Sequence, residues 1–388
     1  MKTSSAFSLF IAFIAAAATA DPATGWLQTA EGTYDYNDTA NWVGGEINGV
    51  FGSDLTLAGN QMVTFGADTA LPDSLQIDFA GGKTLTFASV DSTVRTLTLG
   101  GDIAVGASVK STGVTFESTL AIDLGGADRA IASTSGNATL KFLGTIDNGA
   151  LTLANVGPLY LNVANTYAGG TQLQGTGKVY VAPNAFGTGT VTFEAGASLD
   201  VGAARTFTVG NPLVFNGNWT FGGTSGNLDL GSGPISVTQP VTINITKNTL
   251  LLRGDIVDGD LFDITKAGSG TLATYQDYAL DGEAMLCSTA GTWQFNGVLS
   301  GSGTLYKTGA GSFEPMTAMT FTDLLVIREG TVRFRAKNTL ASGTRVLIEK
   351  DGVLRSNTAK ECNYAYSAPN LLASGAIDPA SNLKSVLL

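Results

Sequence analysis

Short alternations of apolar and polar residues recur along the chain from about Leu55 to Leu354. Alternate positions are apolar, and the positions between them are mostly Thr, Asp, Asn or Gln, which is typical of strands with one buried face. Clusters of Gly, Asn and Asp separate the alternations and indicate tight turns. Helical spacing is nearly absent, so the pattern predicts an all-β protein. Examples of the alternation are Leu75/Ile77/Phe79, Leu120/Ile122/Leu124, Leu159/Leu161/Val163, Val241/Ile243/Ile245 and Val332/Phe334.

Internal repeats narrow the choice among all-β architectures. The segment Lys266–Leu272 (KAGSGTL) recurs as Lys307–Phe313 (KTGAGSF), and a longer echo relates Gly177–Leu199 to Gly330–Leu354. These repeats keep their apolar positions while turn lengths drift. Such variation in turn length is typical of a β-solenoid. Each coil of a solenoid contacts only the coils before and after it, and inserted residues form loops outside the stack. We expect coils of about 20 residues.

The two ends depart from this pattern. Residues 21–54 contain Trp26 and Trp42, and we interpret them as an N-terminal cap, because an uncapped solenoid exposes strand edges. The Trp rings are expected to be buried in that cap rather than to stack on sugars. Residues 55–357 form the predicted repeat domain, and 358–388 a C-terminal tail or cap. There, Asp378-Pro379 resembles a helix start and predicts a short terminal helix.

The first twenty residues have the features of a secretory signal peptide. Lys2 supplies a positive charge, Phe7–Ala18 an apolar stretch, and Ala18–Ala20 a small-residue cleavage site. The apolar stretch is too short for a membrane-spanning helix, which needs about 20 residues. The sequence therefore predicts an exported protein.

Composition removes several functional classes. The 388 residues include 50 Gly and no His, only 14% are charged, and the net charge is −11. Without His, the chain has no His-based triad and no His-ligated metal. The negative charge disfavours nucleic acid. Cys287 and Cys362 are compatible with one disulfide or with two separate thiols.

Three short blocks resemble a known family. Asn165–Thr171 (NTYAGGT) is followed by Gly175–Val181 and Phe186–Thr192, and Leu299–Gly311 (LSGSGTLYKTGAG) adds a second phrase. Together with the opening Trp26–Gly45, these blocks resemble the autotransporter-associated β-strand repeat, also called the passenger-associated transport repeat.

The resemblance implies a right-handed parallel β-helix at the bacterial cell surface, in the outer membrane or in the medium, without catalytic residues. Its signature positions are expected to be structural, with an Asn bonding a corner, a stacked Tyr and turn glycines: Asn165, Tyr167, Gly169, Gly170 and Gly177. A full member ends in a large translocating β-barrel, and the stretch after residue 357 is too short for one. We therefore expect simple secretion, or outer-membrane association through a partner or a missing C-terminal region.

One acidic cluster is a candidate site. Asp255, Asp258, Asp260 and Asp263 crowd a Gly-containing loop, where carboxylates are able to ligate Ca²⁺ or to form the acid pair of a glycosidase. The spacing does not match an EF-hand loop, and solvated turn residues explain the same cluster. We therefore expect no bound metal or cofactor, with calcium as the weak alternative.

The sequence thus favours a non-catalytic structural or adhesion protein, with glycans or surface and matrix proteins as partners and no nucleic acid. Its long Thr- and Asn-rich face would bind weakly and repeatedly. One alternative is a polysaccharide-active β-helix enzyme, a lyase or hydrolase, which rests on analogy of fold. The other is a passenger segment that mainly assists export and folding.

Overall fold

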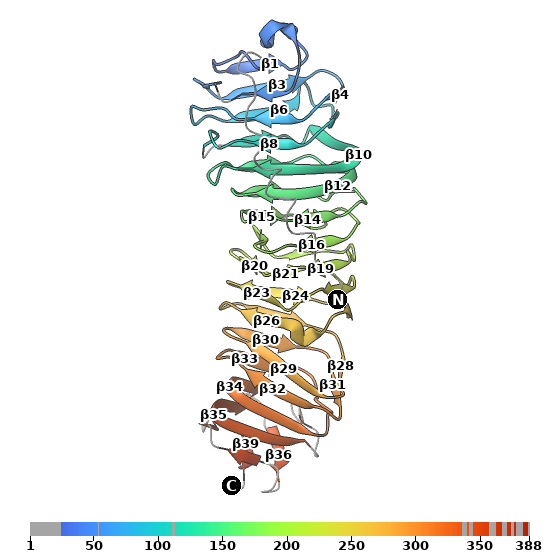
Figure 1. The fold of residues 1–388 in the computed structure, drawn as a ribbon, viewed down its shortest axis with the longest axis vertical. Helices are drawn as coiled ribbons and strands as arrows, with labels where there is room; N and C mark the ends of the chain where they lie inside the picture. The colour runs from blue at the N-terminus through green and yellow to red at the C-terminus, as the bar shows by residue number, and fades with distance from the viewer. Residues whose placement is uncertain are drawn as a thin grey trace, which may run out of the picture. The chain divides into compact units, whose positions relative to one another are not determined.

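The computed structural model describes residues 25–52, 54–110, 113–335, 340, 344–356, 362–366, 371–373, 376–377 and 383–386. The predicted signal peptide, residues 1–20, lies outside this range. The chain divides into two compact units, Met1–Val191 and Thr192–Leu388. Each unit is a parallel β-helix, in which every turn adds a strand to the same sheets (Figure 1). The predicted all-β solenoid fold is therefore confirmed.

In the first unit, the strands of successive turns pair in parallel in two main sheets. One sheet contains β1 (Gly32–Asp35), β3 (Gln61–Phe65), β6 (Leu85–Ser89), β9 (Val114–Phe116), β11 (Leu140–Phe142), β13 (Leu159–Leu161) and β15 (Lys178–Val181). The other contains β2 (Val50–Phe51), β5 (Leu75–Ile77), β8 (Ile103–Val105), β10 (Leu120–Ser133), β12 (Ile146–Asn155) and β14 (Thr171–Leu173). A third face is made by β4 (Thr69–Ala70), β7 (Arg95–Thr98) and the first part of β10.

The second unit repeats this plan with three sets of strands. The first set is β17 (Ser198–Asp200), β20 (Trp219–Phe221), β23 (Val241–Ile245), β26 (Ile264–Ala267), β29 (Glu283–Ser288), β32 (Thr304–Thr308), β34 (Leu324–Phe334), β35 (Arg345–Ser356) and β37 (Leu371–Ala373). The second is β18 (Arg205–Thr206), β21 (Leu228–Asp229), β24 (Thr249–Leu252), β27 (Thr271–Thr274), β30 (Thr292–Phe295), β33 (Ser312–Pro315) and β38 (Ala376–Ile377), with β34 and β35 between the last two.

The third set in this unit is shorter. It consists of β19 (Leu213–Phe215), β22 (Ile235–Val237) and β25 (Ile256–Asp258), with β28 (Tyr278–Leu280) and β31 (Leu299–Gly301) as a separate pair. The strand β16 (Val191–Phe193) lies at the division between the units.

Like side chains stack in columns inside each unit. In the first, Phe87, Phe116 and Phe142 are partners in register, and their rings are stacked with centroids 4.9 and 4.7 Å apart. All three are fully buried. Burying one such side chain stabilises the fold by about 1.5–3 kcal/mol, so these columns form the core.

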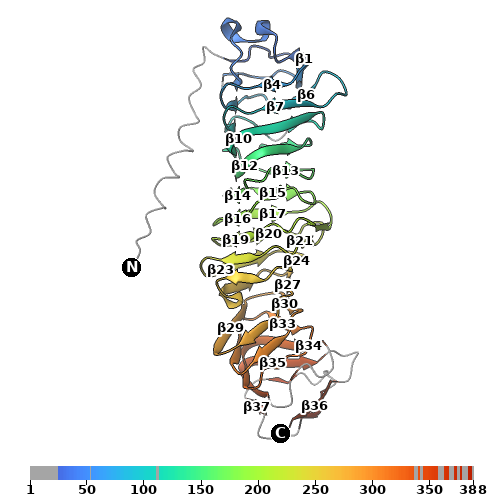
Figure 2. The ribbon, with the colours of Figure 1, turned by 90° about the vertical axis from the view of Figure 1, so that its right-hand side faces the viewer.

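Turn length varies more than the sequence predicts. Hydrogen bonds between neighbouring turns show the length of a turn. The two bonded residues are 19 positions apart for Ile146 and Asn165, but 30 positions apart for Ser89 and Thr119. The expected coil of about 20 residues is therefore too short for much of the first unit. The physical reason is that loops leave the solenoid without disturbing the strands, so their length is not constrained by the core. Figure 2 shows such a loop between β6 and β7.

The segment predicted to be the N-terminal cap is built around buried aromatic rings. Trp26 and Trp42 form an antiparallel bridge, with ring centroids 5.0 Å apart. Their indole N–H groups donate to Gln61 Oε1 (3.0 Å) and to the Tyr36 carbonyl (2.8 Å). Only 5% and 1% of these two side chains are exposed, so they offer no face to a sugar. The expectation of burial is confirmed.

The C-terminal strands correct one prediction. Leu383–Val386 form the strand β39, which pairs in parallel with β36 (Cys362–Tyr366), so the predicted short terminal helix is wrong there. Capping residues favour a helix locally, but a neighbouring strand offers backbone partners that override this weak preference. Asp378 and Pro379 lie outside the described residues.

Candidate functional site

A hollow of about 260 Å³ lies on the second unit, between the 3-10 turn Leu261–Asp263 and the strands β28 and β29. This 3-10 turn forms one side of the hollow. Asp260 is the N-cap of the turn and accepts a hydrogen bond from the Phe262 N–H (2.8 Å). We call this site the acidic hollow. Its charged and aromatic lining consists of Asp260, Phe262, Asp263, Tyr278, Asp281 and Glu283.

Tyr278 organises the acidic hollow. Its hydroxyl donates to Asp260 Oδ2 (2.8 Å), and its ring packs edge-on against Phe262, with centroids 4.9 Å apart. Burial, the hydrogen bond to Asp260 and the nearby carboxylates together raise the pKa of Tyr278 well above its usual value. The phenol therefore stays protonated and keeps one Asp260 oxygen occupied.

Two of the four predicted carboxylates face this hollow. Asp260 and Asp263 line it, whereas Asp258 lies in β25 and Asp255 precedes that strand. Both Asp260 oxygens accept hydrogen bonds from the protein. Among the residues that the structure describes, no three His, Cys, Asp or Glu side chains are grouped so that they could hold a metal ion. The predicted cluster is thus divided: Asp260 and Asp263 line the hollow, and Asp255 and Asp258 do not.

The sequence analysis missed three residues of the acidic hollow. Tyr278, Asp281 and Glu283 come from the following turn, and only stacking brings them beside Asp260. Glu283 Oε1 accepts from the Tyr306 hydroxyl (3.0 Å), and the guanidinium of Arg328 covers the Tyr306 ring at 4.1 Å. The sequence did contain one signal for this grouping: Asp281 and Glu283 follow Asp260 and Asp263 after one predicted coil of about 20 residues.

The signature residues of the resemblance lie in the first unit and hold turns together. Asn165 is buried; its Oδ1 accepts from the Ile146 N–H (2.8 Å) and its Nδ2 donates to the Ala185 carbonyl (2.6 Å). Its side chain thus joins three successive turns. Tyr167 is also buried, and its hydroxyl lies 2.7 Å from Thr171 Oγ1.

The three signature glycines lie where the chain passes close to a neighbouring turn. A Cβ at Gly169 would lie 2.7 Å from Ala150 Cβ, and one at Gly177 would overlap the Gly157 carbonyl oxygen. Gly170 has φ +102°, a conformation that L side chains rarely adopt. These positions therefore require Gly for backbone reasons.

A second hollow, of about 340 Å³, adjoins these residues, and Asn148 in its lining donates to Asp123, one of two carboxylates in register. Asp123 on β10 pairs in register with Asp147 on β12, beside a β-bulge. Asp123 Oδ1 accepts from the Gly125 N–H (2.7 Å) and from Asn148 Nδ2 (2.8 Å). Burial, helped by the charge of Asp123, raises the pKa of Asp147. The hollow is lined by Gly126, Asp128, Asn148, Gly149, Ala150, Thr166, Tyr167, Ala168 and Gly169.

Two lysines are fully buried at corners of the second unit. Lys266 Nζ donates to the carbonyls of Gly268 and Ala290, the latter at 2.7 Å. Lys307 Nζ donates to the carbonyls of Thr308 (2.8 Å), Gly309 (2.5 Å) and Glu329 (3.0 Å). Burial lowers the pKa of both ammonium groups to about 8. The repeated K-x-G-x-G segments are therefore corner clamps, a role that the sequence analysis did not assign.

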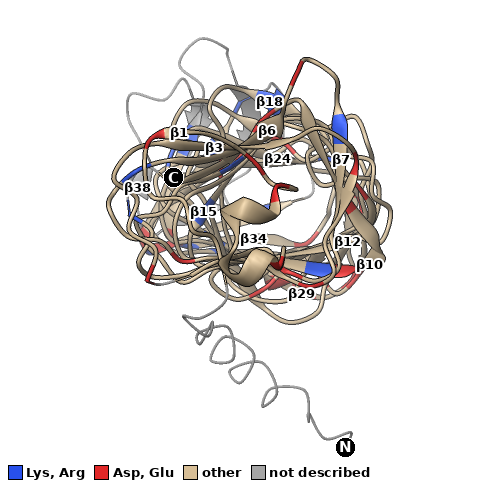
Figure 3. Ribbon diagram, turned by 90° about the horizontal axis from the view of Figure 1, so that it is seen from above, with Lys and Arg blue, Asp and Glu red and all other residues tan. Residues whose placement is uncertain are grey.

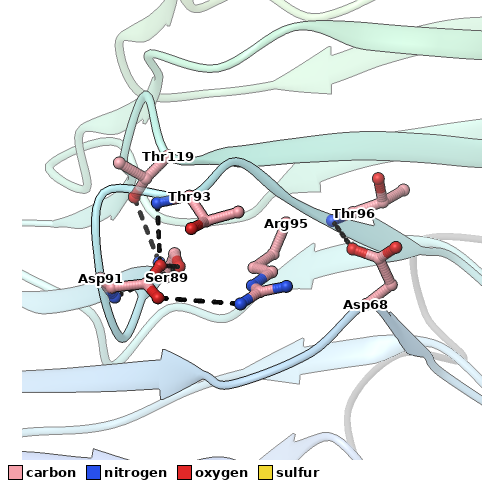
Figure 4. A network of polar contacts seen from close by, with 7 residues as sticks. All are labelled: Asp68, Ser89, Asp91, Thr93, Arg95, Thr96 and Thr119. Atoms are coloured by element: carbon pink, nitrogen blue, oxygen red, sulfur yellow. Dashed lines mark hydrogen bonds and ion pairs between the residues drawn. The ribbon is translucent and has the colours of Figure 1, made fainter.

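A polar network fixes the projecting loop between β6 and β7 (Figure 4). Asp91 Oδ1 accepts from the Thr93 N–H (2.8 Å), and Asp91 Oδ2 lies 3.8 Å from Arg95 Nη2. These hydrogen bonds, foremost that from the Thr93 backbone, lower the pKa of Asp91. Ser89 and Thr119 tie the loop to the next turn. The network therefore supports the loop.

Cys287 has a free, half-buried thiol on β29. It pairs in register with Thr265 and Thr308. Of the two expected alternatives, the structure shows a free thiol at Cys287, and the side chain of Cys362 lies outside the described residues.

The fold and these sites together define an all-β, parallel β-helix protein with few charged residues, which are coloured blue and red along the ribbon in Figure 3. Comparisons with protein-family models, with curated proteins and with solved structures find no match to this chain. The helices in the described part of the chain are three-residue turns, too short to cross a membrane.

Proposed function

We propose that this chain is a non-catalytic, exported structural and adhesion protein of the autotransporter-passenger type. The proposal rests on the resemblance of Asn165–Thr171 and Leu299–Gly311 to the passenger-associated repeat and on the β-helix fold. Its place of action would be the cell surface, the outer membrane or the medium.

The observation that carries the proposal is a regular outward column on the first unit. Successive turns place equivalent side chains one above another, about 4.8 Å apart. The column is Met62, Thr86, Thr115, Lys141, Tyr160 and Tyr180. Its last two rings are stacked with centroids 4.4 Å apart. Such a face presents repeated weak contacts, which gain strength by avidity.

The buried charged side chains of the second unit also support a structural role. Asp200, Asp229 and Lys266 are buried and hydrogen-bonded at turns. Their hydrogen bonds compensate the cost of burial. In this part of the molecule, ionisable side chains therefore support the backbone.

Adhesion is tested by comparing the intact protein on beads with the same protein as a soluble monomer. Bead-bound protein should adhere to glycan- or matrix-coated surfaces far more strongly than the monomer binds. The double variant Y160S/Y180S should reduce adhesion, and Y306S, an outward Tyr in the second unit, serves as the control. Equal adhesion by all three proteins would contradict a role for the column.

A polysaccharide-active enzyme is the second candidate, favoured by the stacked Asp123 and Asp147. A carboxyl group with a raised pKa, such as Asp147, beside a second carboxylate suits the general acid of such an enzyme. Release of reducing or unsaturated sugar ends from polysaccharides, lost in D147N, would establish it. The variants D258N and D260N test the predicted cluster in the same assay.

A further inference from the structure

The loop between β6 and β7 projects from the first unit (Figure 2) and exposes two valines. Val90 is 61% exposed and Val94 is 60% exposed, and the three residues between them are exposed as well. Single exposed apolar side chains are ordinary at protein surfaces. Two on one short loop stand out here, because this chain separates its strands mainly with Gly, Asn and Asp. We call Val90–Val94 the valine loop.

The fold itself does not need the valine loop. The turn that contains it is long: the hydrogen-bonded residues Ser89 and Thr119 are 30 positions apart, against 19 for Ile146 and Asn165. Extra residues in a solenoid leave the stack without disturbing its strands. The exposed valines therefore add nothing to the core. Surface loops that a rigid scaffold positions often contain the residues that bind a partner.

Neighbouring turns fix both ends of the valine loop. The Val90 N–H donates to the Phe65 carbonyl (3.1 Å), and the Arg95 N–H donates to the Thr119 carbonyl (2.9 Å). The valine side chains are themselves stiff, because branching at Cβ restricts their rotation. A loop that is already ordered loses little conformational entropy when it binds, and this favours affinity.

Asp91 places a carboxylate between the two valines. Its Oδ1 accepts from the Thr93 N–H (2.8 Å) and from the Ser89 hydroxyl (3.2 Å), which fixes the side chain at the tip of the loop (Figure 4). Its Oδ2 lies 3.8 Å from Arg95 Nη2, and 53% of the Asp91 side chain is exposed. An exposed ion pair contributes little. A partner that covers the valines must therefore also supply a hydrogen-bond donor or a positive charge to Asp91.

We propose that the valine loop docks into an apolar pocket of a protein, with a basic side chain of that protein against Asp91. The inference rests on the proposed adhesive function and names its partner class. A glycan mainly offers hydroxyl groups, which gain no hydrogen bond from a valine. Insertion into a membrane would draw the ionised Asp91 out of water, and the valine loop has no Trp or Tyr to anchor it at the interface.

The test measures binding of the full-length protein to surfaces coated with fibronectin and with collagen, and a dextran coat serves as the glycan reference. The key variant is V90T/V94T, which keeps the branched shape of both side chains but gives each a hydroxyl group. Binding to a protein coat should weaken about tenfold or more, because the hydroxyl groups would enter an apolar pocket without partners.

The matched control is V257T, which makes the same substitution at an exposed valine on β25 of the second unit. Val257 is 66% exposed. We expect V257T to bind as the wild type does.

D91N tests the charge separately. Asn keeps an oxygen that accepts from the Thr93 N–H, so the loop retains its shape while the negative charge is lost. Binding of the wild type should weaken as salt is raised, because salt screens the contact with the basic side chain. D91N should bind more weakly at low salt and depend less on salt. An unchanged salt dependence would refute the basic residue in the partner.

Three outcomes would overturn the proposal: equal binding by the wild type and V90T/V94T, equal losses in V90T/V94T and V257T, or stronger binding to dextran or to phosphatidylglycerol vesicles than to the protein coats. If the wild type still adheres to a glycan or protein coat in these cases, the valine loop is wrong and the adhesive function stands. If the wild type adheres to no surface at all, the proposed function fails as well.

Discussion

The ammonium group of Lys266 lies 2.7 Å from the carbonyl oxygen of Ala290, which belongs to the next turn of the second unit. The contact closes a corner by joining two turns through a buried cation. Lys307 repeats the arrangement with the carbonyl of Glu329. Because both lysines have a pKa of about 8 in the folded protein, they couple stability to pH.

We predict that the free energy of unfolding contains a term that rises between pH 8 and about pH 10. In the unfolded chain these lysines have a pKa of about 10.4, so in this range the unfolded state binds more protons and higher pH favours the folded state. The expected gain is about 2 kcal/mol per lysine. Urea unfolding at pH 7, 8 and 9.5 measures it.

The variant K266M should lose its share of this pH dependence, whereas K141M, which removes an exposed lysine, should keep it. Identical slopes in the wild type and K266M would contradict a depressed pKa at Lys266.

Replacing Asn165 should destabilise the first unit. N165A leaves the Ile146 N–H without its partner and the Ala185 carbonyl with only the long contact from the Tyr167 hydroxyl (3.5 Å), at a cost of about 2–3 kcal/mol. N165D should cost more, because it buries a charge facing a carbonyl oxygen. Chemical denaturation measures both. N162A, at an exposed position on the same turn, should change stability by less than about 0.5 kcal/mol; a similar cost there would show that the amide bridge is unimportant.

Gly187 should not tolerate a side chain. Its φ is +66°, and a Cβ would overlap the carbonyl oxygen and approach the ring of Tyr167. We expect G187A to cost more than about 2 kcal/mol. G202A is the matched control, because a Cβ at Gly202 meets nothing within 4 Å. Thermal unfolding measures both variants. Equal decreases in the unfolding midpoints of G187A and G202A would contradict the prediction.

Calcium should leave the second unit unchanged. The two oxygens of Asp260 accept hydrogen bonds from Phe262 and Tyr278, so a cation would have to displace both. Isothermal titration and melting curves with millimolar calcium should show neither heat nor a shift, since stabilisation follows only from binding to the native state. In Y278F one oxygen is released, and calcium binding that appears only in this variant would support the explanation. A saturable heat with the wild type would refute it.

The strands were predictable from sequence to a useful degree, because alternation identifies which side chains face the core. Leu159 and Leu161 fall in β13, and Val332 and Phe334 fall in β34, as their spacing predicts. The alternation does not identify the partner strand, since turns differ in length. The same limit concealed the acidic hollow: Tyr278 meets Asp260 only because the register stacks one turn on the other.

Two further features lay outside what the pattern reveals. A lysine is usually exposed, so nothing in the residue type indicated that Lys266 is buried; only carbonyl groups at a corner make this acceptable. The strand at Leu383–Val386 replaced a predicted helix because pairing with Cys362–Tyr366, far away in sequence, outweighs local capping preference.

The stacked rings of Phe87, Phe116 and Phe142 also bear on how such a molecule changes over generations. Each phenylalanine occupies the equivalent position in its own turn. A duplicated turn would therefore add one more ring, which would pack between the aromatic rings of the turns on either side. Lengthening by whole turns therefore needs no new core to be invented, whereas inserting half a turn would place a polar face against the rings. The heritable unit of this architecture is the turn, and gene duplication is its natural mode of growth.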